Sequence, residues 1–204
     1  MIKPIFLFLL FFSGLAGAQT PVLKVGDILL QPLKCWACSL IEAEEETIFS
    51  HVGIVLEVTP EIKVAEAFGK VRLVSLKEFD AKTEPGQNLA VLRFRNDRIQ
   101  REFDRSSALL LHYYQTEFHG RKYDHDFRWN NFDEEGEEKF YCSELISKLI
   151  KRYIQVDLPI KRMHFQTNRE AWINYFRGNV PDGLWGNSPG DFERSELFYQ
   201  VGEL

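Results

Sequence analysis

Apolar residues alternate with polar ones, or form short continuous runs, through most of the first half of the chain. Both patterns are typical of β-strands when turn-forming residues bound them. The pair Thr59-Pro60 between two such runs predicts the turn of a hairpin. The predicted strands are 25–31, 51–58, 63–68, 71–75 and 89–94.

Apolar residues recur at helical spacing in much of the second half, most clearly over 140–153. Residues 120–139 and the Gly/Pro/Asn-rich tail after Arg177 are predicted to be loops. Strands first and helices later indicate an α+β domain with an antiparallel sheet. The other predicted helical segments are a turn near 40–45, a short helix at 76–80 capped by Ser75, and helices at 97–117 and 166–176.

The N-terminus has the pattern of a secretory signal peptide at 1–18. Lys3 precedes an apolar run over 5–12, and small residues follow up to Ala16-Gly17-Ala18. The run is much shorter than the roughly 20 residues that span a bilayer, although an uncleaved membrane anchor is the alternative interpretation. Cleavage would leave 19–204 as a single domain with no transmembrane segment, secreted to the periplasm or outside the cell.

The formal charge of the 204-residue chain is −5, and its basic residues are scattered rather than clustered. This distribution argues against a nucleic-acid partner, because nucleic acid is bound by a concentrated positive surface. The chain has 17 phenylalanines, which indicates a core rich in aromatic rings or a groove partly lined by them.

Three cysteines, Cys35, Cys38 and Cys142, leave at least one thiol unpaired within the chain. Cys35 and Cys38 are near enough in sequence to pair with each other, which would leave Cys142 free. A zinc site built on Cys35 and Cys38 would need two histidines at finger spacing, and the sequence offers none. We therefore expect no metal, and the chemistry considered below needs no cofactor.

Cys142 lies in the first turn of the helix predicted at 140–153, where free N–H groups and the helix dipole stabilise an anion. A thiolate there can act as a nucleophile, whereas a lone cysteine is more often a buried structural residue. A cysteine nucleophile also needs a base. His51 begins a predicted strand, so its side chain can face the start of a helix that lies across the sheet. The remaining histidines are interpreted as solvated or capping residues, namely His112, His119, His125 and His164.

Glu66 is the candidate for the group that orients His51, because it interrupts an apolar strand in which an unpaired carboxylate would be costly. A two-residue turn at Val58 and Thr59 would place Glu66 directly opposite His51. A shifted turn or a bulge would separate the two residues, and a solvent-facing Glu66 is a further alternative.

These residues belong to an ordered set of short motifs that resembles the YiiX/YebB-like family of circularly permuted papain-like hydrolases, within the NlpC-like superfamily. The resemblance runs from about residue 25 to residue 202, which is nearly the whole of 19–204. It implies a small antiparallel sheet packed against helices, with the histidine strand before the cysteine helix. The motifs are Gly26-Asp27, Ser50-His51-Val52-Gly53, Glu66-Ala67, Tyr123-Asp124, Tyr141-Cys142-Ser143-Glu144 and the closing Ser188-Pro189-Gly190-Asp191.

Carried over by position, the resemblance implies that Cys142 is the nucleophile, His51 the base and Glu66 the third polar residue. The supporting residues that it implies are Gly26 and Asp27 beside the site, Tyr123 and Asp124 shaping the cleft, and Tyr141. The pair Cys35/Cys38 is not part of the family's pattern. It could form a structural disulfide in the loop before His51 or be redox-active, and we favour the structural disulfide.

The resemblance implies hydrolysis of an amide bond through a covalent acyl-enzyme. For a secreted protein the expected substrate is peptide-like, and cell-wall peptide (peptidoglycan) cleaved by an amidase or endopeptidase is the first hypothesis. An acyl or lipid thiol hydrolase or acyltransferase is an alternative, because lecithin–retinol acyltransferase-like proteins share the permuted arrangement. A non-catalytic binding protein on a hydrolase scaffold is the alternative of another class, although it would have no need of Cys142, His51 and Glu66 together.

Overall fold

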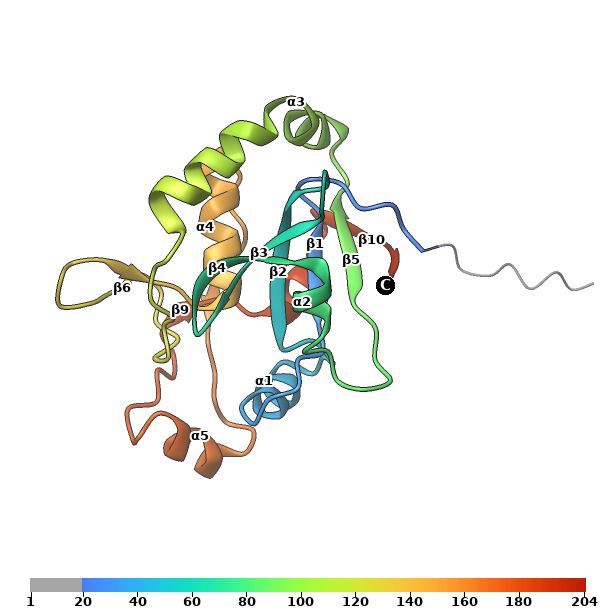
Figure 1. Cartoon of the computed structure of the whole chain (residues 1–204). Coiled ribbons are helices and arrows are strands. Elements are labelled where there is room, and N and C mark those ends of the chain that lie inside the picture. Colours follow the sequence, from blue (N-terminus) through green and yellow to red (C-terminus); the bar gives the residue numbers. More distant parts are fainter. Residues whose placement is uncertain (1–19) are drawn as a thin grey trace, which may run out of the picture.

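The computed structural model describes residues 20–204, so the predicted signal peptide at 1–18 lies outside the described residues. A six-stranded antiparallel sheet forms its centre, with the strand order β10-β5-β1-β2-β3-β4 (Figure 1). The strands are β1 (Ile28–Gln31), β2 (His51–Glu57), β3 (Lys63–Phe68), β4 (Lys70–Ser75), β5 (Ala90–Phe94) and β10 (Phe198–Glu203). The predicted α+β fold with an antiparallel sheet is confirmed.

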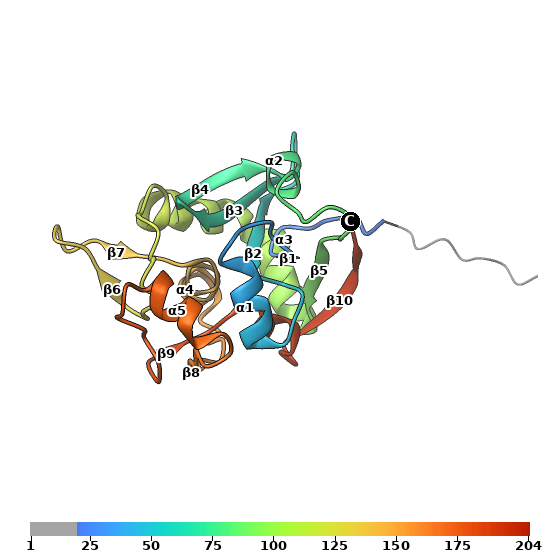
Figure 2. The same ribbon diagram turned by 90° about the horizontal axis from the view of Figure 1, so that it is seen from below.

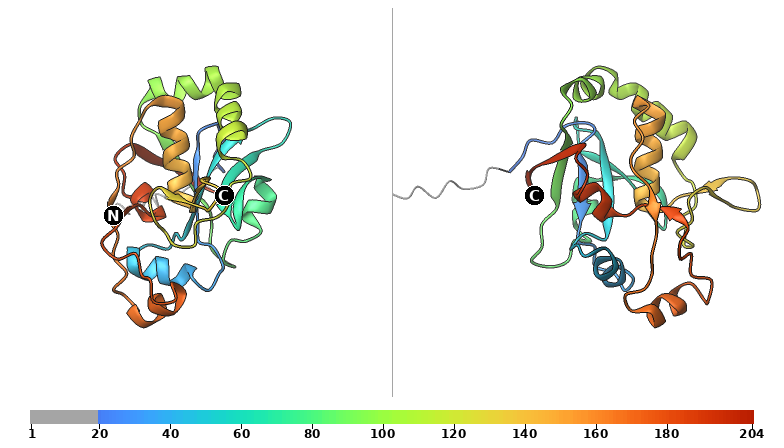
Figure 3. Two further views of the ribbon diagram at one scale, coloured as in Figure 1. Left: turned by 90° about the vertical axis from the view of Figure 1, so that its left-hand side faces the viewer. Right: turned by 180° about the vertical axis from the view of Figure 1, so that it is seen from behind.

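Helices cover both faces of the sheet and one of its ends. α3 (Asp97–Tyr113) and α4 (Cys142–Ile154) lie over one face, and the short α2 (Leu76–Asp80) packs on the other (Figures 1 and 3). A short π-helix, η1 (Tyr114–Phe118), continues α3. The smaller elements are α1 (Cys38–Glu45), α5 (Arg169–Tyr175), α6 (Pro189–Glu193), the projecting hairpin of β6 (Asn131–Phe132) and β7 (Glu138–Lys139), and the pair β8 (Lys161–Arg162) and β9 (Trp185–Gly186).

The central strand β2 is buried along almost its whole length, because both faces of the sheet are covered. From Val52 to Leu56, alternate residues pack against apolar side chains of α3 and α4. On the opposite face, Val55 packs with Val64 and Phe79. This burial on two sides explains why β2 is a continuous apolar run in the sequence, and it holds the first residue of the strand in a fixed place.

A third apolar cluster lies at one end of the sheet, where α1 and α5 lie side by side (Figure 2). Leu40 of α1 packs there with Met163, Phe165 and Trp172. These residues bring the segment between α4 and β9 close to the first turn of α4, and the cleft described below lies between them.

The prediction that the tail after Arg177 has little regular structure is wrong. This segment contains β9, α6 and β10, and β10 pairs with β5 at the edge of the sheet (Figure 3). The pairing shifts between Gln200 and Gly202, and half of the residues of the strand are exposed. A bulge in an exposed edge strand breaks the alternation of apolar and polar residues, so the local pattern did not reveal the strand.

The other predicted elements lie close to their expected positions, with ends displaced by a few residues, and β8 was not predicted. Ser75 caps α2 as predicted, and its Oγ accepts a hydrogen bond of 3.1 Å from the backbone N–H of Glu78. The helix predicted to extend to residue 117 passes into η1 at Tyr114. The predicted loop 120–139 contains the hairpin β6–β7.

Gly26 precedes β1 with a φ of +88°, and a Cβ placed on it would lie 2.5 Å from Cγ of Phe103 in α3. We expect Gly26→Ala to lower the free energy of unfolding by about 2–4 kcal/mol, because the positive φ and the clash both add strain. Gly86→Ala is the matched control, since Gly86 has a φ of +84° and nothing within 4 Å of the added Cβ. This control should lose only about 1–2 kcal/mol in the same urea titration. Equal losses in the two variants would show that Phe103 does not restrict position 26.

Candidate active site

Cys142 is the first residue of α4, directly after Tyr141, whose backbone is extended. Its thiol is free, and the residue is 6% exposed. The first N–H groups of a helix have no acceptor within the helix. The backbone N–H of Cys142 and the helix dipole can therefore stabilise negative charge on its sulfur or on a bound oxyanion.

His51 is the first residue of β2, and its ring lies between Glu66 and Cys142. Its Nε2 lies 2.7 Å from Oε2 of Glu66, which leaves Nδ1 for the hydrogen bond to the Cys142 side chain. His51 is buried, whereas the other four histidines of the chain are exposed. The structure thus brings together Cys142, His51 and Glu66. The exposed His164 lines the same cleft as Cys142, whereas His112, His119 and His125 lie outside it.

The register between β2 and β3 differs from the predicted one. Ile54 pairs with Ala65, so Glu66 falls across from Gly53 rather than from His51. The predicted direct pairing is wrong because the loop between the strands is longer than two residues and a bulge interrupts the ladder. The contact between His51 and Glu66 is therefore diagonal.

Gly53 makes this diagonal contact possible. A Cβ at this position would lie 2.6 Å from Cγ1 of Val64 and 2.8 Å from Cε2 of Phe79, so the packing leaves no room for a side chain. Because position 53 carries none, the Glu66 carboxylate can extend along the strand to the ring of His51. Phe79 flanks that ring at 5.6 Å between centroids and limits its movement.

Two cations that sequence analysis did not single out complete the surroundings of the buried Glu66 carboxylate. Nη2 of Arg72 lies 2.7 Å from Oε1 of Glu66, and Nζ of Lys82 lies 3.4 Å from the same oxygen. Arg72 is the direct partner of Glu66 in the hairpin of β3 and β4. A signal for it was present, since a tight turn at Gly69 aligns the two residues. Lys82 comes from the segment after α2, and no local pattern indicates its contact.

The protonation states of Glu66 and His51 are determined by their contacts with each other and with neighbouring side chains, rather than by solvent. Burial by itself raises the pKa of Glu66, but the hydrogen bond and charge of His51, followed by the charges of Lys82 and Arg72, outweigh it and lower that pKa to about 2. Burial likewise lowers the pKa of His51, but the hydrogen bonds to Cys142 and Glu66 outweigh it and raise that pKa to about 9. At neutral pH the site therefore contains an imidazolium and a carboxylate.

Gly26 and Asp27 do not reach this group. They lie at the start of β1, at the opposite end from Gln31, which is the partner of His51 in the sheet. Asp27 is buried and accepts two hydrogen bonds of 2.7 Å from the guanidinium of Arg93. Their support is therefore indirect, because they brace the sheet that carries His51.

Gln31 is a buried polar neighbour of His51 that sequence analysis did not single out. Its Nε2 donates to the carbonyl of Phe79 at 2.7 Å and to Oγ1 of Thr83 at 2.9 Å. These bonds hold α2 and the segment after it against the sheet, and with them the Phe79 ring beside His51. The available signal was a polar residue that ends an otherwise apolar strand.

A cleft with about 480 Å³ of empty volume lies beside Cys142. Tyr123 and Tyr141 line it, and burial raises the pKa of both hydroxyls well above the ordinary range, so both are neutral. The cleft thus offers mainly apolar and aromatic surface, and Glu44, Glu45 and His164 also line it. The other apolar lining residues are Ile41, Phe127, Met163, Phe165, Trp172 and Pro189.

Asp124 shapes the loop at one wall of this cleft. Its carboxylate accepts hydrogen bonds from the backbone N–H groups of Asp126 at 3.0 Å and Arg128 at 2.8 Å, and from Nδ2 of Asn131 at 2.7 Å. These bonds close the turn that presents Phe127 to the cleft. The role of Asp124 is therefore structural, because its hydrogen bonds hold the turn that forms this wall of the cleft.

The segment after β9 also belongs to the cleft, which the sequence did not predict. The N–H of Asn187 donates to the Tyr141 hydroxyl at 3.3 Å, and its Nδ2 donates to Oγ of Ser147 at 2.6 Å. The Asn187 carbonyl accepts a hydrogen bond of 3.0 Å from Oγ of Ser143. These bonds fix the C-terminal segment across the first turns of α4. Because they are long-range contacts of a loop-like segment, no local pattern indicates them.

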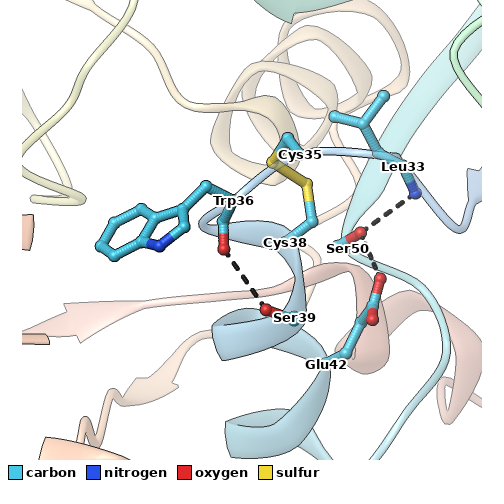
Figure 4. The surroundings of a disulfide bond; sticks show 7 residues. All are labelled: Leu33, Cys35, Trp36, Cys38, Ser39, Glu42 and Ser50. Atoms are coloured by element: carbon cyan, nitrogen blue, oxygen red, sulfur yellow. Dashed lines mark hydrogen bonds between the residues drawn. A yellow bond between two sulfur atoms is a disulfide. The ribbon is translucent and has the colours of Figure 1, made fainter. Parts of the chain in front are cut away.

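Cys35 and Cys38 are joined in a disulfide at the start of α1, as the favoured interpretation predicted (Figure 4). Ser50 forms a second tie in this region. Its Oγ accepts from the backbone N–H of Leu33 at 3.1 Å and donates to Glu42 at 2.7 Å. Since Ser50 precedes His51, these bonds connect α1 to the start of the histidine strand.

The family model described as "permuted papain-like amidase enzyme, YaeF/YiiX, C92 family" matches residues 22–187. This chain belongs to that family. As a member of the permuted papain-like amidase family, it is a cysteine peptidase or amidase, as predicted from the sequence. The match includes both the strand that begins with His51 and the helix that begins with Cys142.

A solved structure supports the fold of this permuted papain-like amidase. It is titled "metalloprotein yiiX" from Escherichia coli O157:H7, with a TM-score of 0.71 and 20% sequence identity. The superposition covers 89% of this chain and 97% of that one. Within residues 20–204 of this chain, no three His, Cys, Asp or Glu side chains are grouped so that they could hold a metal ion. No curated protein sequence matches the chain.

We expect Glu66→Gln to slow the alkylation of Cys142 by iodoacetamide at neutral pH about tenfold, because a neutral amide no longer stabilises the imidazolium beside the thiolate. Glu78→Gln is the matched control. Glu78 also pairs with Arg72, at 3.2 Å, but 52% of its side chain is exposed. Mass spectrometry of the labelled peptide gives both rates. Equal rates in the wild type and Glu66→Gln would show that Glu66 does not act on the Cys142–His51 pair.

Proposed function

We propose that this chain is a secreted amidase or endopeptidase that cleaves amide bonds in the peptides of the bacterial cell wall. Cys142 is the nucleophile, His51 the general acid and base, and Glu66 the group that orients His51. The observation that carries the proposal is the buried, hydrogen-bonded series Cys142–His51–Glu66 beside an aromatic cleft. A nucleophile, a base and an orienting group within reach of one another are what covalent acyl transfer requires.

In the first half of the reaction, the Cys142 thiolate attacks the carbonyl carbon of the substrate amide. A C–S bond forms, and the electron pair of the C=O double bond moves to oxygen. The backbone N–H of Cys142, which opens α4, can donate to this oxyanion. Nδ1–H of His51 then protonates the leaving nitrogen, the C–N bond breaks, and a thioester on Cys142 remains.

In the second half, water attacks the thioester carbonyl while the now neutral His51 accepts a proton from it. The C–S bond breaks, the acid product leaves, and the thiolate and imidazolium are restored. Glu66 keeps the ring in place through both halves, because its bond to Nε2 fixes which nitrogen faces Cys142.

Two observations support a secreted enzyme. The sequence of residues 1–18 has the order of a signal peptide, and a disulfide between Cys35 and Cys38 is the kind of bond that persists in oxidising compartments. From residue 20 onward, no helix combines the length and apolar character needed to cross a membrane. Outside a bacterial cytoplasm, cell-wall peptides are the abundant amide substrate, which is why we favour them.

Hydrolysis of an acyl ester or thioester is a second candidate, favoured by the aromatic lining of the cleft. Phe127, Phe165 and Trp172 all line it and could contact an acyl chain. The same residues could equally contact apolar side chains of a peptide. Comparison of the two substrate types on one protein sample separates these candidates.

We expect the wild-type protein to release new amino groups from soluble cell-wall peptides, and Cys142→Ser and His51→Ala to reduce kcat/KM at least about a thousandfold. His119→Ala is the control, because His119 is exposed and lies outside the cleft. Amine release followed by chromatography measures the rates. Hydrolysis that survives in Cys142→Ser would contradict the mechanism, and hydrolysis of acyl esters without any of amides would favour the second candidate.

The rate should also decline as pH rises through about 9, because the raised pKa of His51 marks the loss of the proton that the leaving group needs. The raised pKa of His51 also stabilises the folded state. This contribution to the free energy of unfolding is fully present below pH 6.5 and is lost as pH rises through about 9. In Glu66→Gln, the alkaline limb of kcat/KM should move to lower pH. An alkaline limb at the same pH in both proteins would contradict the assignment of that limb to His51.

A further inference from the structure

Trp36 is an exposed aromatic residue that the proposed chemistry does not use. It lies between the two cysteines of the disulfide, and 65% of its surface is exposed. Figure 4 shows its indole directed away from the disulfide, while the Trp36 carbonyl accepts a hydrogen bond of 3.3 Å from Oγ of Ser39. The disulfide and this bond restrict the backbone on both sides of the indole, so the ring is presented in a defined position.

A series of ring contacts leads from Trp36 to the active site. Trp36 stacks on Tyr175 with 6.1 Å between centroids and 22° between planes. Tyr175 lies 5.6 Å from Phe127, which lines the cleft and lies 5.7 Å from Tyr141. Tyr141 is the residue before Cys142. The exposed indole is therefore the outer end of an aromatic surface whose inner end adjoins the nucleophile.

The hydroxyl of Tyr175 connects this surface to the charges of the site. Burial, followed by the negative charges of Asp124, Asp126 and Cys142, raises the pKa of Tyr175 to about 12. The hydroxyl is thus a neutral group that can donate a hydrogen bond. Asp126, with 56% of its side chain exposed, adds a carboxylate in the same region, and its Oδ2 pairs with Nζ of Lys139 at 3.2 Å and accepts from Nδ2 of Asn131 at 3.1 Å.

We propose that Trp36 and Tyr175 form a subsite that stacks on a sugar ring of the substrate, with Asp126 beside it for the sugar hydroxyls. This inference rests on the proposed function, because the peptides of a bacterial cell wall are attached to a glycan of N-acetylated sugars. A pyranose ring has an apolar face of C–H groups and a rim of hydroxyls. It therefore fits an aromatic face that is open to water and flanked by polar groups.

The surroundings favour a sugar over an acyl chain at this position. An acyl chain gains free energy in proportion to the apolar surface that is removed from water. An indole that is 65% exposed encloses little of such a chain. A sugar ring needs only one apolar face covered, and Tyr175 and Asp126 offer groups that can pair with its hydroxyls. In this arrangement Trp36 determines substrate specificity and takes no part in bond cleavage.

The subsite is tested by titrating Cys142→Ala protein with the β-1,4-linked tetrasaccharide of N-acetylglucosamine in a calorimeter. Trp36→Ala should weaken binding about five- to tenfold, the size of one lost aromatic contact. Trp36→Phe should retain most of the affinity. Trp185→Ala is the matched control, because Trp185 is 47% exposed but stacks on Arg162 in β8. The inference would be overturned if the tetrasaccharide did not bind, or if it bound equally well to Trp36→Ala. It would also be overturned if dodecanoate, rather than the tetrasaccharide, bound in a way that depends on Trp36.

Kinetics separate this inference from the proposed function. For a cell-wall peptide that carries its glycan, Trp36→Ala should raise KM by the same factor and leave kcat unchanged, while the glycan-free peptide should show no change. If Trp36 supports tetrasaccharide binding but no amide is cleaved, the proposed function fails and the subsite remains. If amides are cleaved with a KM that depends neither on the glycan nor on Trp36, the subsite fails and the proposed function remains.

Discussion

The hydrogen bond between His51 and Glu66 is the interaction on which the proposed chemistry depends. A carboxylate removed from water is strongly unfavourable unless it is paired, and Glu66 is fully buried. Its partners are His51 at 2.7 Å, Arg72 at 2.7 Å and Lys82 at 3.4 Å. With His51 protonated, three cations contact this carboxylate, and one of them, Arg72, also pairs with Glu78. The imidazolium that Glu66 holds can pair with negative charge on the Cys142 sulfur, which couples the chemistry of the nucleophile to the packing of the sheet.

The fold supplies this group from elements that lie far apart in the sequence. β2 is covered on both faces, so its first residue, His51, is held in place. The ring of His51 contacts Cys142, the first residue of α4. Gly53 leaves the space through which Glu66 extends, since a side chain there would meet Val64 and Phe79. The disulfide and the Ser50 bonds then hold α1 against the start of the same strand. Rigid elements therefore determine the geometry of the site, while the loop around Phe127 and the segment after β9 form its walls.

The sequence indicated the fold class, most elements and the three central residues, because these depend on local periodicity and on residue chemistry. It did not indicate the register, since tertiary packing decides the length of the turn after β2 and the bulge between Val55 and Glu57 near the end of that strand. Lys82 and Asn187 were missed for the same reason, because their contacts join segments that share no local pattern. β10 was missed because an exposed, bulged edge strand has little apolar alternation. Arg72 is different, since its pairing with Glu66 follows from the tight turn at Gly69 and was predictable.

The most direct test of this account is an NMR titration of the imidazole nitrogens of His51 in the wild type and in Cys142→Ala. We expect wild-type His51 to be an imidazolium at neutral pH and to lose its proton near pH 9, because the contacts with Cys142 and Glu66 raise its pKa to about 9. In Cys142→Ala, the pKa of His51 should fall. A wild-type His51 that titrates near its ordinary pKa of 6.5, or that is unaffected by the loss of Cys142, would contradict the account.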